Sequence, residues 1–337
     1  IKKNDIFTTT IEDMSDQGAG IGKTDGYTWF IKDTVVGDVV EASAMKMKKS
    51  YGYGRLIRVI KPSDARVEPP CPVARQCGGC QLQAMSYEEQ LKFKENKVYN
   101  NLVRIGKIGN LRRVTQAEAV GLEQGEAGLR QEEAGPGQEA AGLGPETSRL
   151  GPQAAGNGEC EGERSEEKAE FFPIMGMENP WRYRNKAQFP FGRDKEGNIV
   201  TGFFAERTHA IIPQEDCLLG IEENPKILKI IKDFMIRNHI SVYEEESHRG
   251  LIRHVLIRKG FRTGELMVCL VINGKNMPRM EELIGSLKEM KGMTSISYNI
   301  NTEKTNVIMG KESVHVYGPG FITDYIGDVK YRISPLS

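Results

Sequence analysis

The sequence lacks the features of a membrane-spanning or secreted protein. None of its apolar runs is long enough to cross a bilayer, and the opening Ile-Lys-Lys-Asn-Asp lacks the apolar core of a signal peptide. Only six cysteines occur among 337 residues, which is a poor disulfide scaffold for so long a chain. We therefore expect a cytoplasmic protein whose clustered cysteines bind a metal or a cluster.

Few residue patterns indicate catalysis. The sequence has no Ser-His-Asp or paired-carboxylate arrangement, and its five histidines show no metal-ligand spacing. His254 lies in a strand-like run and is interpreted as structural. No glycine-rich turn follows a strand and opens a helix in the way that cofactor phosphates require. We expect no catalytic and no cofactor-binding residue within this chain.

The formal net charge is zero, since 46 Lys and Arg balance 46 Asp and Glu. The balance conceals an asymmetry, because residues 116–170 contain thirteen Glu and only four basic residues. The remainder of the chain therefore has nine more basic than acidic residues. A basic folded part favours an anionic partner.

Residues 116–170 also lack aromatic side chains and repeat a loose Glu-Ala-Gly-Pro-Gln theme. Such a segment buries too little apolar surface to offset the entropy of ordering. We predict a disordered acidic insertion, which loop-closure entropy tolerates. Cys160 lies inside it and is excluded from any metal site.

Residues 1–62 are predicted to form an OB-like β-barrel. Strand-like runs at residues 27–31 and 39–44 alternate with glycine-rich stretches at residues 17–22 and 51–54, which we interpret as turns. Aromatic side chains beside Arg55 are candidates for stacking on bases, although several must fill the core of so small a barrel. These aromatic residues are Tyr27, Trp29, Tyr51 and Tyr53.

The rest of the chain is predicted to be α+β, which makes the whole an α+β multidomain protein. Residues 86–105 form a helix with an apolar stripe of Leu91, Val98, Leu102 and Ile105. A central domain, residues 171–337, follows the insertion. Its helices begin at Asn224-Pro225 and after Pro278, and its strands cover residues 251–259, 265–272, 295–301 and 313–317.

Three cysteines fall within ten residues in the motif Cys71-x5-Cys77-Gly-Gly-Cys80. A cluster needs several thiolates converging on one small volume, and a tight loop supplies three of them. Cys217, in a polar loop, is the candidate fourth ligand, whereas Cys269 lies in an apolar strand and reads as a small buried hydrophobe. The spacing favours an iron–sulfur cluster over zinc, whose structural sites usually show two separated pairs, but leaves zinc open.

Basic residues alternate with aromatic ones in the strand-like run from Arg182 to Lys186. A strand would align Arg182, Arg184 and Lys186 on one face, where they could follow a phosphate backbone or simply be solvated. Arg253, in a later strand, is a further candidate for contact with RNA, as is Arg55 in the barrel.

These motifs together resemble the RNA uracil-5-methyltransferases that act on ribosomal RNA, mostly 23S, and in relatives on transfer RNA. The resemblance is carried by the cysteine motif with Gln81, the downstream Cys217, and Pro180-Trp-Arg-Tyr-Arg-Asn-Lys-Ala187. The barrel ending in Ile60-Lys-Pro-Ser63 resembles the TRAM domain of that family. The resemblance covers the chain except residues 116–170.

The resemblance implies a [4Fe-4S] cluster held by Cys71, Cys77, Cys80 and Cys217, with residues 63–85 as its loop. It implies S-adenosyl-L-methionine as methyl donor and structured ribosomal RNA as partner of a monomeric enzyme.

The resemblance also implies where catalysis should occur. The catalytic residues would lie beyond Ser337, in a C-terminal Rossmann-like methyltransferase domain that we expect to be truncated away from this chain. Residues 86–115 would pack on that domain, so the fragment alone should be inactive. The alternative is a non-enzymatic RNA-binding module with a cluster or zinc.

Overall fold

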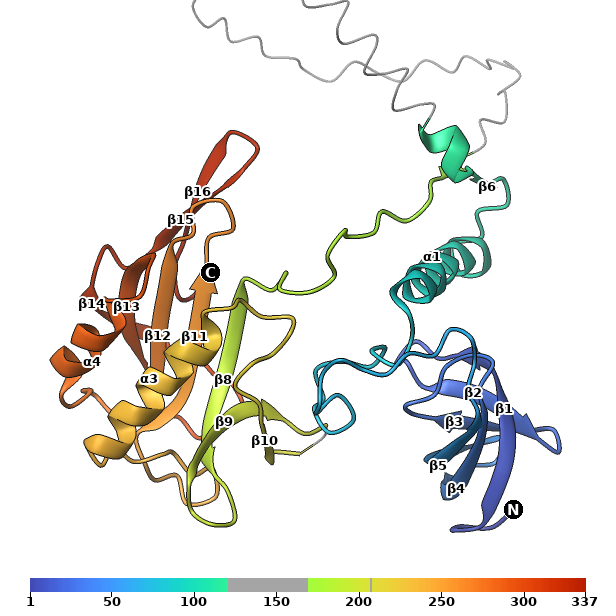
Figure 1. The fold of residues 1–337 in the computed structure, drawn as a ribbon, viewed down its shortest axis with the longest axis horizontal. Coiled ribbons are helices and arrows are strands. Elements are labelled where there is room, and N and C mark those ends of the chain that lie inside the picture. The colour runs from blue at the N-terminus through green and yellow to red at the C-terminus, as the bar shows by residue number, and fades with distance from the viewer. Residues whose placement is uncertain (121–168, 207) are drawn as a thin grey trace, which may run out of the picture. The chain divides into compact units, whose positions relative to one another are not determined.

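The structure is a computed structural model that describes residues 1–120, 169–206 and 208–337 (Figure 1). The chain divides into two compact units, one made of residues 1–87 and 177–337 and the other of residues 88–176. Cys160 and most of the predicted insertion lie outside the described residues, so the disorder of that insertion stays a prediction.

The N-terminal strands close into a barrel, as the sequence predicts. The hydrogen-bonded order is β1-β2-β3-β5-β4, with β4 returning to β1, and β3 runs parallel to β5. Closure leaves none of these five strands with a free edge. The strands are β1 (Ile6–Met14), β2 (Gly20–Thr24), β3 (Tyr27–Ile31), β4 (Val39–Met47) and β5 (Tyr51–Lys61).

Trp29 fills the centre of this barrel and corrects one prediction. It is fully buried and stacks on Phe7 with ring centroids 4.2 Å apart. A Cβ on Gly52 would lie 2.5 Å from Cζ3 of Trp29, so only glycine fits there. The prediction that residues 51–54 form a turn is therefore wrong: these residues begin β5, and glycine is present because the strand passes directly over the indole ring.

A buried ion pair ties the barrel to the segment that follows it. The side chain of Asp38 is fully buried and lies 2.8 Å from Nη2 of Arg66, which also donates to the carbonyl of Asp33. Burial by itself would raise the pKa of Asp38. Hydrogen bonds from Arg66 and from the backbone amides of Ser63 and Val35 outweigh burial and hold that pKa below its usual range.

The central domain is a seven-stranded sheet in the order β10-β9-β8-β11-β12-β13-β14. Among these described strands, only β12 and β13 pair in parallel. The strands are β8 (Lys186–Arg193), β9 (Ile199–Phe204), β10 (Ile211–Pro213), β11 (Ile252–Lys259), β12 (Leu266–Ile272), β13 (Met293–Ile300) and β14 (Glu312–Tyr317). The four strands predicted after residue 250 are confirmed.

Two helices, α3 (Asn224–Arg237) and α4 (Met280–Leu287), lie across one face of this sheet (Figure 1). Both were predicted, and the apolar stripes bury as expected: Ile227, Ile231 and Leu283 are fully buried. They pack with Val255 and Val268 of the sheet into one hydrophobic core. The predicted α+β architecture is confirmed.

The remaining elements are short. β15 (Ile322–Ile326) and β16 (Val329–Ile333) form a hairpin in the first unit. In the second unit lie α1 (Tyr87–Arg104, whose first residue belongs to the first unit), β6 (Arg112–Arg113) and β7 (Glu170–Phe171). No helix that the structure describes is long and apolar enough to span a membrane.

The second unit confirms one prediction and refines another. Helix α1 corresponds to the predicted helix, and none of its residues is buried, with Val98 and Ile105 of the apolar stripe exposed. The predicted ends of the insertion are wrong by a few residues. Residues 116–120 are helical, and Glu170 belongs to β7, which pairs with β6. Thr115 and Glu118 cap that short helix reciprocally, a local signal that the acidic composition concealed.

Candidate functional site

Four cysteines surround one pocket in the first unit. Cys71, Cys77 and Cys80 come from the loop after the barrel, and Cys217 comes from the segment between β10 and α3. All four are partly exposed free thiols. Cys269 is fully buried in β12, as the sequence predicts. The structure thus brings the cysteine triplet together with Cys217, the candidate fourth ligand, although Cys217 lies far from the triplet in the chain.

Backbone contacts attach the cysteine loop to the central domain. Cys77 forms a β-bridge with Ala205, and the amide of Gly78 donates to the carbonyl of Phe204 at 3.3 Å. The amide of Gly79 donates to Sγ of Cys77 at 3.4 Å. A Cβ on Gly78 would lie only 3.2 Å from Cα of Glu206. Gly78 therefore permits the close approach that positions Cys77.

Arg182 holds the segment that carries the fourth cysteine. Its guanidinium makes a bidentate pair with Asp216, with N–O distances of 2.6 and 3.0 Å, and donates to the carbonyls of Cys217 and Gly220. Arg182 has a φ of 57° and lies before β8, so the predicted alignment of Arg182, Arg184 and Lys186 along one strand face is wrong. The structure gives Arg182 a protein partner in place of a phosphate.

The thiols influence one another electrostatically. Burial raises the pKa of Cys77, and the other three cysteines raise it further, against a lowering by the hydrogen bond from Gly79. Burial likewise raises the pKa of Cys80, whereas Gln83 and the nearby Arg184 lower it. These thiols are close enough to repel as thiolates, and a bound cation would reverse that balance.

The donor set fits a four-thiolate cluster or a four-thiolate zinc site. Within residues 1–120, 169–206 and 208–337, however, no group of three or more Cys, His, Asp or Glu side chains is arranged so that it could hold a metal ion. The structure therefore shows a shared cysteine-lined pocket and does not show a cluster. The iron–sulfur assignment stays a prediction, and zinc stays open beside it.

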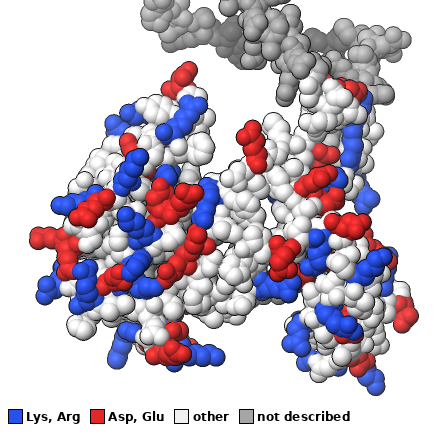
Figure 2. All heavy atoms as spheres, viewed as in Figure 1, with Lys and Arg blue, Asp and Glu red and all other residues white. Residues whose placement is uncertain are grey.

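The predicted RNA-binding residues lie in different surroundings. Arg184 is exposed and lines the cysteine pocket. Lys186 is exposed at the start of β8, where burial and the neighbouring Arg258 lower its pKa. Arg55 is exposed on the outer face of the barrel. Lys and Arg are interspersed with Asp and Glu over α3 and α4, without a continuous basic patch on the face seen in Figure 2.

Arg253 does not fit the predicted role. It is only 4% exposed and donates to the carbonyls of Asn301, Glu303 and Thr305, and its guanidinium lies over the Tyr243 ring. This arginine fixes the loop after β13. The prediction that it faces RNA is corrected, because β11 is a central strand covered on both faces.

His254, beside it, was interpreted as a satisfied structural histidine, and the structure supports that interpretation only by its burial. The side chain is buried, and neither ring nitrogen has a hydrogen-bond partner among the described residues. Burial, with a smaller contribution from Arg253, lowers the pKa of His254 to about 4. The imidazole is therefore neutral near pH 7.

A second pocket lies on the barrel, around Arg55. It is lined by residues that sequence reasoning named, Tyr51 and Tyr53, and by others that it missed, Phe30, Lys46 and Lys48. The signal for the missed residues was strand alternation, because Phe30 and Tyr53 pair across β3 and β5. The interpretation of residues 51–54 as a turn concealed it.

Ser337, beyond which the catalytic residues were expected, lies against the central sheet. Its carbonyl accepts a hydrogen bond from Nη2 of Arg258 in β11, and its hydroxyl lies 2.9 Å from the hydroxyl of Ser334. The backbone amide of Ser337 donates to the carbonyl of Ser334 at 3.3 Å. Residues 334–337 are thus folded back on themselves and on the sheet domain.

The family model for the TRAM domain matches residues 2–57. Over its whole length the chain is 38% identical to an uncharacterized RNA methyltransferase of Clostridium tetani and 38% identical to one of Halalkalibacterium halodurans. These matches cover 60% and 61% of the two relatives, so the chain spans about 60% of the length of the curated relatives it matches.

Among solved structures, the fold is similar to the Pyrococcus abyssi tRNA (uracil-54, C5)-methyltransferase in complex with S-adenosyl-L-homocysteine. The TM-score is 0.58 at 20% identity, over 97% of this chain and 59% of that chain.

This likeness does not test the expected truncation. It extends over 97% of this chain but only 59% of that chain, so the expectation that a methyltransferase domain has been cut away after Ser337 stays a prediction. The placement of the catalytic residues beyond Ser337 and the inactivity of the chain alone likewise stay predictions. Residues 2–57 form a TRAM domain, and the chain as a whole is similar to bacterial proteins named RNA methyltransferases.

Proposed function

We propose that this chain serves S-adenosyl-L-methionine-dependent methylation of uracil C5 in structured RNA, with 23S ribosomal RNA as substrate. The observation that carries the proposal is the 38% identity to proteins named RNA methyltransferases along the entire chain, beginning with a TRAM barrel. The shared fold with a uracil-5-methyltransferase of transfer RNA supports the reaction type. The cysteine motif supports ribosomal RNA as the substrate, because the family that the sequence resembles acts mostly on ribosomal RNA.

In this proposal Cys71, Cys77, Cys80 and Cys217 hold a [4Fe-4S] cluster. A cluster bound there supplies a covalent link between two distant segments and takes no part in methyl transfer. The chain's own residues prepare the link: Gly78 brings the cysteine loop against Phe204, and Arg182 fixes the backbone of Cys217. The cluster would thus hold the RNA-binding barrel and the central domain as one body.

The exposed basic residues would contact phosphates. Arg55 on the barrel and Arg184 and Lys186 beside the cysteine pocket have no ion-pair partner among the residues that the structure describes. Each phosphate neutralised releases counterions, so RNA affinity should fall steeply with rising salt. Substituting one of these residues by Gln should reduce the slope of log affinity against log salt concentration by about 1, whatever the RNA sequence.

The reaction is tested in cells that carry a deletion of the gene. Ribosomal and transfer RNA would be purified separately, digested, and analysed for 5-methyluridine by mass spectrometry, with the same strain carrying the restored gene as control. We expect one 5-methyluridine to disappear from 23S RNA and to return with the restored gene.

Two outcomes would change the assignment. Loss of 5-methyluridine from transfer RNA alone would move the substrate to transfer RNA, the class named for the Pyrococcus abyssi enzyme of similar fold. Unchanged 5-methyluridine in both RNA classes would overturn the reaction and leave the non-enzymatic RNA-binding module.

A further inference from the structure

The outer face of the barrel displays three aromatic rings that its core does not need. Along β5 the sequence Tyr51-Gly-Tyr-Gly-Arg55 alternates, and Gly52 and Gly54 face inward because Trp29 and Ile31 occupy the space beneath them. Tyr51, Tyr53 and Arg55 consequently face outward. The barrel core is complete without them.

Phe30 of β3 joins the two tyrosines to form what we call the aromatic platform, namely Phe30, Tyr51 and Tyr53. Its ring centroids are 5.6 to 5.9 Å apart, so each ring contacts the other two. Phe30 and Tyr51 are half-buried, whereas Tyr53 remains 42% exposed. Neighbouring aromatic rings held on rigid strands are an efficient surface for stacking flat ligands.

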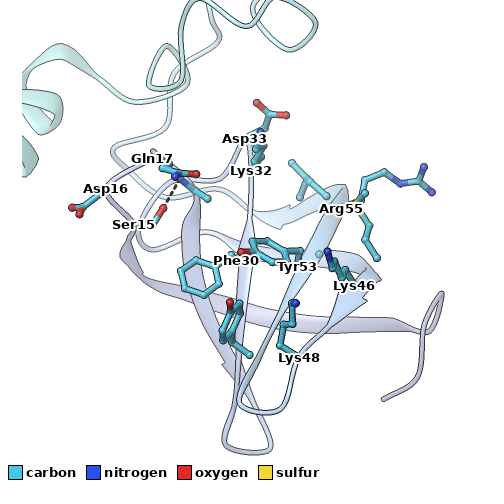
Figure 3. A pocket seen from close by; sticks show the side chains of 15 residues that line it. Ser15, Asp16, Gln17, Phe30, Lys32, Asp33, Lys46, Lys48, Tyr53 and Arg55 are labelled. Carbon is cyan, nitrogen blue, oxygen red and sulfur yellow. Dashed lines mark hydrogen bonds between the residues drawn. The ribbon is translucent and has the colours of Figure 1, made fainter. Parts of the chain in front are cut away.

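Cations border the platform in the same pocket, which is shown in Figure 3. Lys46 pairs with Tyr53 across β4 and β5, and Lys48 and Arg55 lie at the two sides. None of these three has an acidic partner among the described residues. Away from the rings in Figure 3 lie the two acidic residues of the pocket, Asp16 and Asp33, and Lys32, which is paired with Glu206. The unneutralised charge is therefore concentrated beside the rings.

A second basic side chain of β5 provides a contrast. Arg58 is also exposed, but Glu41 on β4 accepts two hydrogen bonds from its guanidinium, at 3.1 and 3.2 Å. The barrel thus neutralises a cation that lies away from the rings and leaves those beside the rings free. Aromatic faces next to unpaired cations are complementary to a ligand that has both flat bases and phosphates.

We propose that the aromatic platform binds unpaired nucleotides of the RNA, with a base stacked on Tyr53 and the phosphates along Lys46, Lys48 and Arg55. Identifying the ligand as RNA rests on the proposed function. Paired bases in an RNA helix hide their faces in the stack, so the platform selects single-stranded segments next to the uracil to be modified. The barrel would therefore recognise an accessible loop and not a helix.

The test measures binding by fluorescence anisotropy with two labelled probes, a single-stranded octauridylate and an RNA duplex of the same length. For Tyr53→Ala we expect binding of the octauridylate to weaken roughly 5- to 150-fold, the range found for loss of one base–aromatic stack. Tyr53→Phe and Tyr53→Trp should bind like the unchanged protein because each keeps a ring. Duplex binding should be weaker and unaffected.

Matched controls separate stacking from charge and from folding. Tyr325→Ala removes a tyrosine of similar exposure from β15, outside the barrel, and should leave binding unchanged. Lys48→Gln should weaken binding modestly and reduce its salt dependence by about one charge. Thermal melting of every variant confirms that the barrel is folded, and Tyr53→Leu, which removes the ring but keeps an apolar side chain, provides the test if Tyr53→Ala unfolds.

The proposal is overturned if Tyr53→Ala binds octauridylate as tightly as Tyr325→Ala does, or if both probes weaken equally. This result is independent of the reaction. If gene deletion abolishes 5-methyluridine but Tyr53→Ala binds octauridylate normally, the proposed binding role of the aromatic platform is wrong and the proposed methylation is supported. If Tyr53→Ala weakens octauridylate binding but gene deletion leaves 5-methyluridine unchanged, the binding role of the platform is supported and the proposed methylation is wrong.

Discussion

The barrel and the cysteine-lined pocket are built in opposite ways. Strands β1 to β5 follow one another within residues 6–61 and bury their own core around Trp29. The pocket unites distant segments: Gln214 contacts Cys71, 143 positions earlier in the chain. Short loops make the barrel inexpensive to close in entropy, whereas the pocket requires the sheet domain to form first. Damage to one region should therefore leave the other intact.

The largest effect is expected from breaking the pocket itself. Cys217→Ser removes one of four thiolates, and we expect loss of the broad absorbance near about 400 nm and of the iron and acid-labile sulfide of anaerobically purified protein. Cys269→Ser, in the buried strand β12, is the matched control and should retain both. If the unchanged protein contains stoichiometric zinc and no labile sulfide, the four cysteines form a zinc site and not an iron–sulfur cluster.

The reverse experiment breaks the barrel. Trp29→Ala leaves a large cavity and should lower the free energy of unfolding of the barrel by about 3–5 kcal/mol. Hydrogen exchange should quicken in β3 and β5 and stay slow in β11 and β12. Trp181→Ala, which removes the other tryptophan from outside the barrel, should leave β3 and β5 protected. Faster exchange throughout after Trp29→Ala would show that the regions fold together.

The ion pair between Asp38 and Arg66 provides a pH-dependent test of the join between barrel and pocket. Asp38→Asn should cost about 3 kcal/mol of unfolding free energy near pH 7, because Arg66 is left without its buried partner. The folded-state pKa of Asp38 lies below its ordinary value of 3.8, so the stabilisation is present above pH 3.8 and is lost as pH falls through the lowered pKa.

Urea titrations of both proteins between pH 7 and pH 2 measure this difference. The two unfolding free energies should stay separated by a constant amount above pH 5 and converge below pH 3.8. A separation that persists at the lowest pH would mean that the carboxylate charge is not the cause.

The smallest effect on stability is expected from changing Arg182, which fixes the segment that carries Cys217. Arg182→Lys replaces a bidentate pair with Asp216 by a single contact and should cost about 1 kcal/mol. Hydrogen exchange should quicken at residues 216–220 and not in the barrel. Arg237→Lys, in an exposed pair with Glu282, should change neither quantity measurably. An equal effect of both substitutions would remove the positioning role of Arg182.

Arg55 and Arg253 show where prediction from sequence failed. Both were singled out as candidates for contact with RNA, Arg55 beside the aromatic residues of the barrel and Arg253 in a strand-like run, yet Arg55 is exposed and Arg253 is 4% exposed beneath three carbonyl groups. The run around Arg253 contains enough apolar residues for a central strand, but its sequence does not reveal what covers the second face. Burial of one arginine depends on a loop that begins at Asn301, about fifty residues later.

The sequence by itself determined the elements whose signals are local. Strand-like runs specified the barrel, although the glycines at residues 51–54 were misinterpreted, apolar periodicity specified α1, α3 and α4, and the cysteine spacing identified three of the four pocket thiols. These features arise from backbone preferences and from burial of one face, which neighbouring residues decide.

Only the tertiary structure decided which side chains share a surface. The union of Cys217 with the cysteine triplet, the pairing of Arg182 with Asp216 and the outward position of Tyr53 above a glycine-lined core all depend on distant segments. Residue identity specifies what a side chain can bind. Its partner is chosen by whichever group the fold brings within hydrogen-bonding or packing distance, and that group lies elsewhere in the chain.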